Sequence, residues 1–202
     1  MQFLPGHTYH VYNQGNNREL IFFSREDYVL FIEKMRKALF PHCSILAWCL
    51  MPNHFHWLIQ VHEDYEVLFN ANQRERKLNP LNKDIGSQLS SYTQAINKKH
   101  HRSGSLFRKR TKAKSLNNDI TKSRNYGINC FLYIHQNPLK AGLVNKMEEW
   151  EFCSFIDYAG LRDGTLCDKT LATDLFKLPN NPDEFYKLSM KTISDDIIQN
   201  LY

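Results

Sequence analysis

Hydrophobic and polar residues alternate in two stretches of the first third of the chain, Thr8–Gln14 and His54–Val61, and this period of two predicts β-strands. Apolar residues at helical spacing follow a capping-box sequence at Ser24–Asp27, which predicts a helix that ends before Pro41. A further strand is predicted over Ser44–Leu50. Because only a short link separates it from the strand that begins at His54, we expect the two to pair antiparallel through a tight turn.

The second half of the chain is less regular. His62–Lys83 is polar and charged and is interpreted as a loop or an insertion. Helical spacing over Gly86–His101 and Tyr126–Gln136 predicts two more helices, and Leu106–Leu116 is interpreted as a basic fourth strand. The resulting order, βαββαβ plus an extra helix, predicts an α+β fold with a ferredoxin-like antiparallel sheet. Its first and third strands would lie in the middle, and the two crossover helices would cover one face.

The composition of the 202-residue chain, 42% hydrophobic and 13% aromatic, is that of a folded globule. Its five cysteines are odd in number and form no C-x-x-C pair, which argues against a disulfide framework or a zinc knuckle. The N-terminus shows no signal-peptide pattern, and the longest apolar run, Ile45–Met51, is too short to span a bilayer. We therefore expect a cytoplasmic protein without a membrane partner.

The net charge of +5 is distributed unevenly along the chain. Residues 148–202 contain eleven Asp or Glu against five Lys or Arg, so the excess of basic residues lies in the preceding part. The run Lys98–Lys114 contains eight Lys or Arg and two histidines, and no acidic residue. Such a run can neutralise several nucleic-acid phosphates, which predicts binding that weakens with salt. The alternative is a basic face that only contacts solvent.

The change of charge near residue 150 also suggests how the chain is divided. Residues 1–150 contain every predicted strand and are interpreted as the main domain, whereas residues 151–202 form an acidic C-terminal extension. The sequence also predicts a terminal helix from about Pro182 to Leu201. We expect the extension to pack on the same domain, where it could also regulate access to a ligand or mediate dimerisation.

The candidate chemistry begins with His54-Phe55-His56. On a strand the side chains of His54 and His56 lie on one face, and those of Phe55 and Trp57 lie on the other. Two imidazoles on a central strand are suited to binding a metal ion on a rigid support. Two surface histidines that contact only water would have the same short pattern.

A second candidate group lies on the helix predicted around residue 133. Tyr133 and Asn137 are four residues apart, so the phenol and the amide lie on one helical face, and Asn137 could provide an oxygen ligand. His135 falls roughly on the opposite side and is interpreted as structural. Tyr126 is the competitor for Tyr133, since a spacing of seven nearly restores the same face, although Gly127 weakens the local helix.

These motifs resemble, in order and spacing, those of the REP-associated tyrosine transposases, which belong to the HUH single-strand endonucleases and are related to single-tyrosine transposases of bacterial insertion sequences. The resemblance spans about residues 5 to 158. It also includes Trp150 and Ser154. The motifs that carry it are Tyr9–Arg18, Met51–Trp57, Gly104–Arg110 and Tyr133–Val144.

The resemblance implies a metal-dependent transesterification of DNA. His54, His56 and Asn137 would hold Mg²⁺ or Mn²⁺, and mixed nitrogen and oxygen ligands suit Mn²⁺ better. Tyr133 would be the nucleophile that forms a 5′-phosphotyrosine, although the sequence does not identify its general base. The implied substrate is single-stranded DNA beside imperfect, repetitive hairpins in the bacterial nucleoid, and the implied enzyme is a monomer or a homodimer.

The expected DNA-binding residues lie in the basic run and in the polar loop after the first strand. Family members usually have a glutamine where this chain has Arg108, so the resemblance does not extend to a base-reading role at this position. Two other functions are compatible with the sequence: a protein that binds hairpin DNA without cutting it, and a metal-dependent RNA nuclease of the same fold. The full set of expected DNA contacts is Asn16, Arg18, Lys98, Lys99, Arg102, Arg108, Lys109, Arg110 and Lys112.

Overall fold

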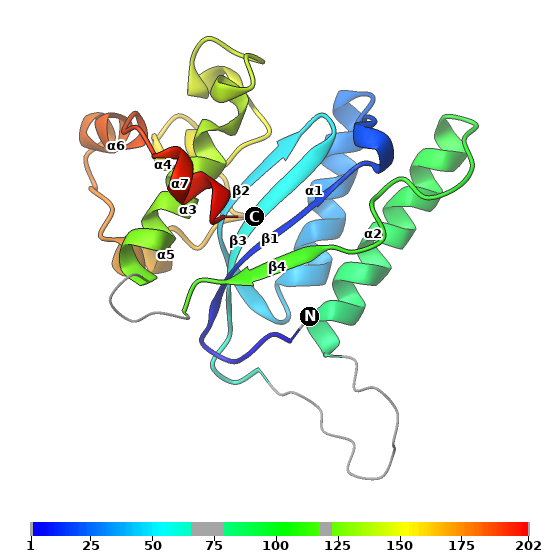
Figure 1. Ribbon diagram of the computed structural model, residues 1–202, viewed down its shortest axis with the longest axis horizontal. Coiled ribbons are helices and arrows are strands. Elements are labelled where there is room, and N and C mark those ends of the chain that lie inside the picture. Colours follow the sequence, from blue (N-terminus) through cyan, green and yellow to red (C-terminus); the bar gives the residue numbers. More distant parts are fainter. Residues whose placement is uncertain (1, 66–78, 118–122, 202) are drawn as a thin grey trace.

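A computed structural model describes residues 2–65, 79–117 and 123–201 and places a four-stranded antiparallel sheet at the centre of the molecule (Figure 1). The strand order is β2-β3-β1-β4, so the first and third strands lie in the middle, as predicted. The α+β, ferredoxin-like fold expected from the sequence is confirmed. The strands are β1 (Thr8–Gln14), β2 (Cys43–Met51), β3 (His54–Val61) and β4 (Lys112–Ser115).

Seven α-helices and two short 3₁₀ helices lie around this sheet in the described part of the chain. The α-helices α1 and α2 pack on one face, and α3 packs on the other together with the C-terminal helices (Figure 1). The helices are α1 (Arg25–Leu39), α2 (Pro80–Lys99), α3 (Ser123–Lys140), α4 (Phe155–Tyr158), α5 (Lys169–Phe176), α6 (Pro182–Ser189) and α7 (Asp195–Gln199), with η1 (Asn16–Arg18) and η2 (Met147–Glu149).

Helix α2 begins six residues before the predicted start at Gly86. Pro80 occupies the first turn, where its missing N–H costs nothing. The hydroxyl of Tyr65 accepts a hydrogen bond from the Leu81 N–H at 3.0 Å and so caps the helix from outside it. The predicted loop His62–Lys83 is therefore too long at its C-terminal end, and its residues 66–78 lie outside the described residues.

Strand β4 is shorter than the predicted Leu106–Leu116. Leu106 and Phe107 turn into the core, where they are 2% and 5% exposed. Asn13 then holds the following loop, because its amide donates to the Arg108 carbonyl at 3.2 Å and to the Thr111 hydroxyl at 3.0 Å. Regular pairing with β1 starts only at Lys112.

The terminal helix predicted over Pro182–Leu201 is wrong as a single element, because two helices, α6 and α7, replace it. Gln136 of α3 causes part of the break. Its amide donates to the carbonyls of Ser189 at 2.7 Å and Lys191 at 2.8 Å. Ile193 is buried in the linking segment, and α7 then begins after Ser194. The tail therefore folds around α3 instead of extending away from it.

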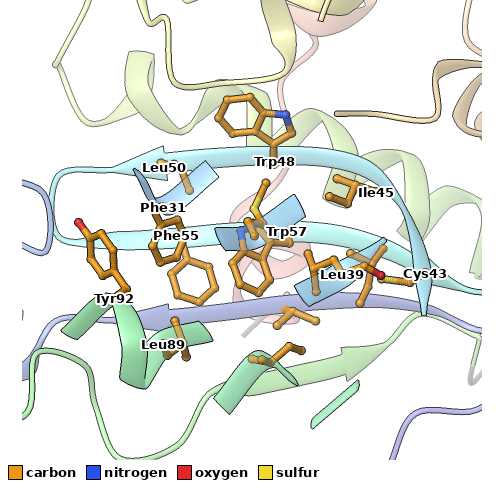
Figure 2. Close-up of a cluster of buried hydrophobic side chains, with 14 of the residues drawn as sticks. Phe31, Leu39, Cys43, Ile45, Trp48, Leu50, Phe55, Trp57, Leu89 and Tyr92 are labelled. Atoms are coloured by element: carbon orange, nitrogen blue, oxygen red, sulfur yellow. The ribbon is translucent and has the colours of Figure 1, made fainter. Parts of the chain in front are cut away.

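Alternation along β3 divides the interior into two cores. Phe55 and Trp57 pack toward α1 and α2, with their ring centroids 4.2 Å apart, and Phe31 of α1 lies 5.4 Å from Phe55 (Figure 2). Leu58 packs on the opposite face with α3. His56 alternates with these apolar residues, so the sheet presents it beneath α3, as the period-two pattern predicts.

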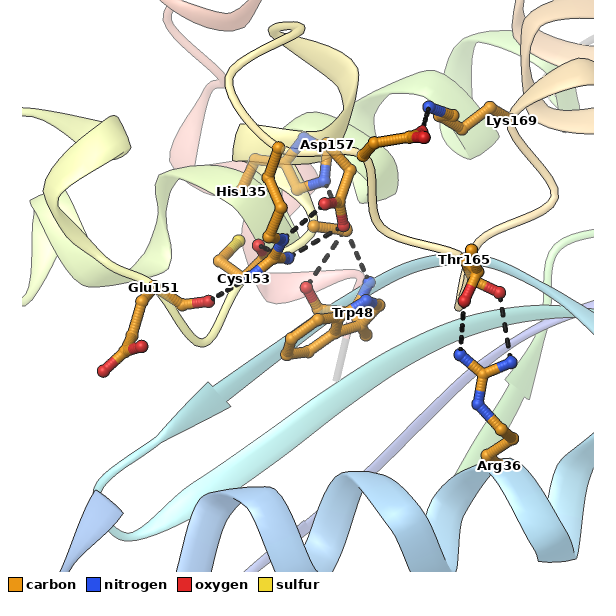
Figure 3. A network of polar contacts seen from close by, with 11 residues as sticks. Arg36, Trp48, His135, Glu151, Cys153, Asp157, Thr165 and Lys169 are labelled. Carbon is orange, nitrogen blue, oxygen red and sulfur yellow. Dashed lines mark hydrogen bonds and ion pairs between the residues drawn. The ribbon is translucent and has the colours of Figure 1, made fainter. Parts of the chain in front are cut away.

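Polar contacts join the C-terminal segment to the outer strand β2 (Figure 3). The Ser154 hydroxyl accepts a hydrogen bond from the Trp48 N–H at 2.9 Å and lies 2.7 Å from His135 Nε2. The side chain of Asp157 is 1% exposed and forms an ion pair with Arg162 at 2.5 Å. Residues 151–201 thus pack directly on the sheet and on α3. No helix within the described ranges is long and apolar enough to cross a membrane.

Candidate active site

The two histidines of β3 lie together with a third histidine from β1. The ring centroids of His54 and His56 are 5.0 Å apart, and their planes meet at 84°. His56 pairs in the sheet with Tyr12 of β1, which brings His10 diagonally across from it. The His10 and His56 rings stack with centroids 5.1 Å apart. The three imidazoles therefore form one cluster on the face of the sheet beneath α3.

Burial controls the protonation of this cluster. Loss of solvent lowers the pKa of His54 to about 4. Burial, with added repulsion from His10 and His54, lowers the pKa of His56 well below its usual value. Neutral imidazoles at pH 7 have a nitrogen lone pair available for a metal ion. The surface-histidine alternative does not describe His56, which is 1% exposed.

Tyr133 is the tyrosine that α3 brings to the histidine cluster. Its ring centroid lies 5.7 Å from that of His56 and 6.5 Å from that of His10, both in edge-on arrangements. The ammonium of Lys140 lies 6.0 Å from the centre of the Tyr133 ring. Tyr133 is 5% exposed, so its ring is enclosed between the helix and the sheet.

Tyr126 lies about 10 Å earlier along the axis of α3. Its ring lies 5.6 Å from the ammonium of Lys114, and burial raises its pKa to about 12. His135 is buried, and its Nε2 contacts Ser154, in agreement with its structural interpretation. Of the residues considered from sequence on this helix, Tyr133 is the one with a ring contact to His56.

Asn137 lies one turn beyond Tyr133 and is 9% exposed. Its amide nitrogen donates to the Tyr133 carbonyl at 3.0 Å, so its Oδ1 is the atom that could ligate a cation. Among the described residues, no group of three or more His, Cys, Asp or Glu could hold a metal ion. The neutral donors of His54, His56 and Asn137 nevertheless fit a divalent ion, provided that the substrate supplies the negative charge.

A cavity of about 220 Å³ opens beside the histidine pair. Among the described residues, its lining contains three cations and no carboxylate, so it suits an anion such as a phosphodiester. It includes three of the residues expected to contact DNA. The lining residues are Tyr12, Asn13, Gln14, His54, His56, Arg108, Arg110 and Lys112.

Other residues expected to contact DNA already have partners within the protein. The ammonium of Lys99 forms an ion pair with buried Asp27 at 2.7 Å, and Arg102 forms one with Glu19 at 3.1 Å. The amide of Asn16 donates to the Ser105 carbonyl at 3.0 Å.

The remaining three expected DNA contacts, Arg18, Lys98 and Lys109, are exposed. Arg18 also adopts a left-handed backbone with φ of 62°. Only Arg108, Arg110 and Lys112 share the cavity with the histidines.

His10 and Tyr12 are site residues that the sequence analysis did not select. The alternation of Thr8–Gln14 places both on the face opposite Tyr9 and Val11, which belong to the other core. The sequence therefore already contains the alternation that places His10 and Tyr12 on one face. Only the strand register, which pairs Tyr12 with His56, shows that this face of β1 lies beside the histidine pair.

No protein-family model and no curated protein matches the sequence. Among solved structures, that of a REP-associated tyrosine transposase bound to a REP hairpin matches with a TM-score of 0.54 and 16% sequence identity. The match covers 83% of this chain and 94% of that chain. The chain thus shares the fold of that transposase over most of the length of both proteins.

Proposed function

We propose that this chain is a single-tyrosine transposase of the HUH type, which cuts and rejoins single-stranded DNA beside hairpin repeats. The observation that carries the proposal is the placement of the Tyr133 ring against His56, a histidine that also lines the basic cavity. A nucleophile, two neutral ligand histidines and a cationic phosphate site are the parts that such a reaction needs.

The proposed reaction is a transesterification at phosphorus. The phenolic oxygen of Tyr133 forms a bond to the phosphorus, and the bond from phosphorus to the 3′-oxygen breaks. The phenol loses one proton and the departing 3′-oxygen gains one, so the products are a 5′-phosphotyrosine and a free 3′-hydroxyl. Attack by another 3′-hydroxyl reverses the step and joins two strands.

The cavity residues have separate roles in this proposal. Arg108, Arg110 and Lys112 would bind the phosphates on either side of the reacting one and orient the strand. His54, His56 and the Oδ1 of Asn137 would hold the divalent ion, Mg²⁺ or Mn²⁺. When bound, the ion supplies polarisation of the phosphoryl oxygens and neutralises charge that develops on them.

The substrate class is inferred from charge and from the fold. A cavity to which the described part of the chain contributes three cations fits a nucleic-acid backbone. The transposase with the same fold was solved with a REP hairpin, which supports a hairpin-bearing DNA as the partner of this chain.

A second candidate function is hairpin binding without cleavage. The observation that favours it is the burial of Tyr133, a residue that is 5% exposed, because a nucleophile has to reach the phosphate. The basic cavity would serve such a binding protein equally well.

One assay distinguishes these functions. The protein is incubated with hairpin-bearing single-stranded DNA and Mn²⁺, and a protein–DNA adduct that resists denaturant is sought by gel electrophoresis. We expect the adduct, and we expect EDTA to prevent it. Tight binding without cleavage would support the binding protein, and cleavage without an adduct would support a metal-dependent nuclease. Either result would overturn the proposed transesterification.

A further inference from the structure

His10 connects the histidine pair to the C-terminal end of the chain. It lies on β1 and is fully buried. Its Nδ1 lies 3.0 Å from the carbonyl oxygen of Leu201, and its Nε2 lies 2.9 Å from Nδ1 of His56. Both ring nitrogens of His10 therefore have defined contacts within the protein.

The chemistry of these contacts assigns the protons. A carbonyl oxygen can only accept, so Nδ1 of His10 carries the hydrogen that it donates to Leu201. The ring of His10 is fully buried, and the cost of burying a charge favours its neutral form. A neutral ring with its proton on Nδ1 has the lone pair on Nε2. His56 must then donate its own Nδ1–H to His10, which leaves the lone pair of His56 on Nε2.

His54 reaches the same tautomer by a different route. Its Nδ1 lies 2.6 Å from the side-chain oxygen of Asn53, the preceding residue. That oxygen accepts a hydrogen bond, so His54 also carries its proton on Nδ1 and its lone pair on Nε2. Both histidines of β3 thus have their lone pair on Nε2. The neighbouring Asn53 fixes this tautomer in His54, and His10 of another strand fixes it in His56.

We propose that His10 is a positioning residue that fixes the tautomer and ring orientation of His56, so that His56 offers Nε2 to a divalent cation. Hydrogen-bond partners of this kind fix the tautomer and ring orientation of a ligand histidine, and their removal substantially lowers the affinity for the metal. The Leu201 carbonyl anchors the arrangement by fixing His10 in turn. The relevance of this role to DNA cleavage rests on the proposed function, whereas the tautomer itself does not.

The first test needs no metal. Two-bond ¹H–¹⁵N correlation spectra of the ¹⁵N-histidine-labelled protein report which ring nitrogen of His56 is protonated. We expect the Nδ1–H tautomer in the wild-type protein and in His10→Gln, because glutamine keeps one acceptor and one donor. In His10→Leu the preference should be lost. An Nε2–H tautomer in the wild-type protein, or an unchanged spectrum of His56 in His10→Leu, would overturn the proposal.

The second test measures Mn²⁺ binding by electron paramagnetic resonance, in the Tyr133→Phe background with hairpin-bearing single-stranded DNA present, so that no turnover interferes. We expect His10→Leu to weaken Mn²⁺ binding about 10- to 100-fold and His10→Gln to retain most of the affinity. Equal affinity of His10→Leu and the parent protein would contradict the positioning role. Thermal melting of each variant reports whether its fold is retained.

These tests separate the two proposals. If no DNA adduct forms but the tautomer and the Mn²⁺ affinity respond as expected, the role of His10 stands and the transesterification fails. If the adduct forms and His10→Leu changes neither measurement, the proposed function stands and the role of His10 is refuted.

Discussion

At the scale of single residues, the basic side chains of the chain differ in their surroundings: some line the cavity and others pair with carboxylates of the protein. Arg108, Arg110 and Lys112 line the cavity beside His54, whereas Lys99 faces a buried carboxylate. The sequence presents all four within one basic run. The structure therefore divides that run into residues placed for a ligand and a residue engaged in holding the protein together.

This division predicts different effects of equivalent substitutions. Lys112→Ala removes one cation from the cavity, so we expect weaker binding of hairpin-bearing DNA and a salt slope reduced by about 1. Lys37→Ala on α1, on the other side of the sheet, is the matched control and should leave both unchanged. Fluorescence anisotropy over a range of NaCl concentrations measures the slope. The same slope in Lys112→Ala and in the wild-type protein would refute a phosphate contact.

The residues of the site differ in how far sequence could predict them. His54 and His56 follow from alternation on a strand, and Tyr133 follows from helical spacing combined with the family resemblance. Alternation along β1 also indicates the face on which His10 lies, but its contact with His56 depends on how two distant strands pair. Such pairing is a non-local property that the sequence of either strand does not contain.

At the scale of elements, the junction between α1 and α2 depends on one carboxylate. Asp27 accepts hydrogen bonds from the backbone N–H groups of Phe23 and Ser24 at the start of α1, and from Lys99 at the end of α2. Burial alone would raise its pKa, but the hydrogen bond from Lys99 and those from the backbone outweigh burial and lower the pKa. The two helices are therefore tied together by an ionised group.

This junction predicts a pH dependence of stability. Because the folded protein lowers the pKa of Asp27, its contribution is complete above the ordinary value of 3.8 and is lost as the pH falls through the lower folded value. We expect Asp27→Asn to reduce the free energy of unfolding by about 1–3 kcal/mol at pH 7 and by less near pH 3. Urea unfolding at both values measures the difference. A loss of equal size at both would contradict the ionised role of Asp27.

The ends of the helices are harder to predict from the sequence than the order of the helices and strands. The order βαββαβ follows from local periodicity and is confirmed. The start of α2 depends on the distant hydroxyl of Tyr65, and the break between α6 and α7 involves Gln136 of α3. A side chain outside the helix itself therefore helps to set each of these limits.

At the scale of the whole molecule, the acidic C-terminal segment packs on the sheet and on α3, while the basic cavity opens beside the histidine pair. Arg162 is one connection within that segment: it pairs with Asp157 and donates to the carbonyls of Glu151 and Cys153. Since the second core contains both sheet residues and C-terminal residues, the segment and the sheet should unfold together.

Two ion pairs of the C-terminal segment differ in burial, so we expect their removal to change the free energy of unfolding by different amounts. Asp157→Ala removes a carboxylate that is 1% exposed and leaves the partly exposed guanidinium of Arg162 without its ion-pair partner, so we expect a loss of about 2 kcal/mol in the free energy of unfolding. Arg25→Ala is the control, because its ion pair with Glu151 is exposed to solvent, and it should cost far less stability than Asp157→Ala. Urea unfolding followed by circular dichroism compares them. Equal losses would contradict a stabilising role for the ion pair of Asp157 and Arg162.

The central claim is that Tyr133 is the nucleophile of a DNA transesterification, and the most direct measurement is to find the linked residue. The protein is reacted with hairpin-bearing single-stranded DNA and Mn²⁺, and the adduct is digested and mapped by mass spectrometry. The account predicts a nucleotide on Tyr133, and loss of the adduct in Tyr133→Phe but not in Tyr126→Phe. A nucleotide on Tyr126, or an adduct that survives in Tyr133→Phe, would contradict it.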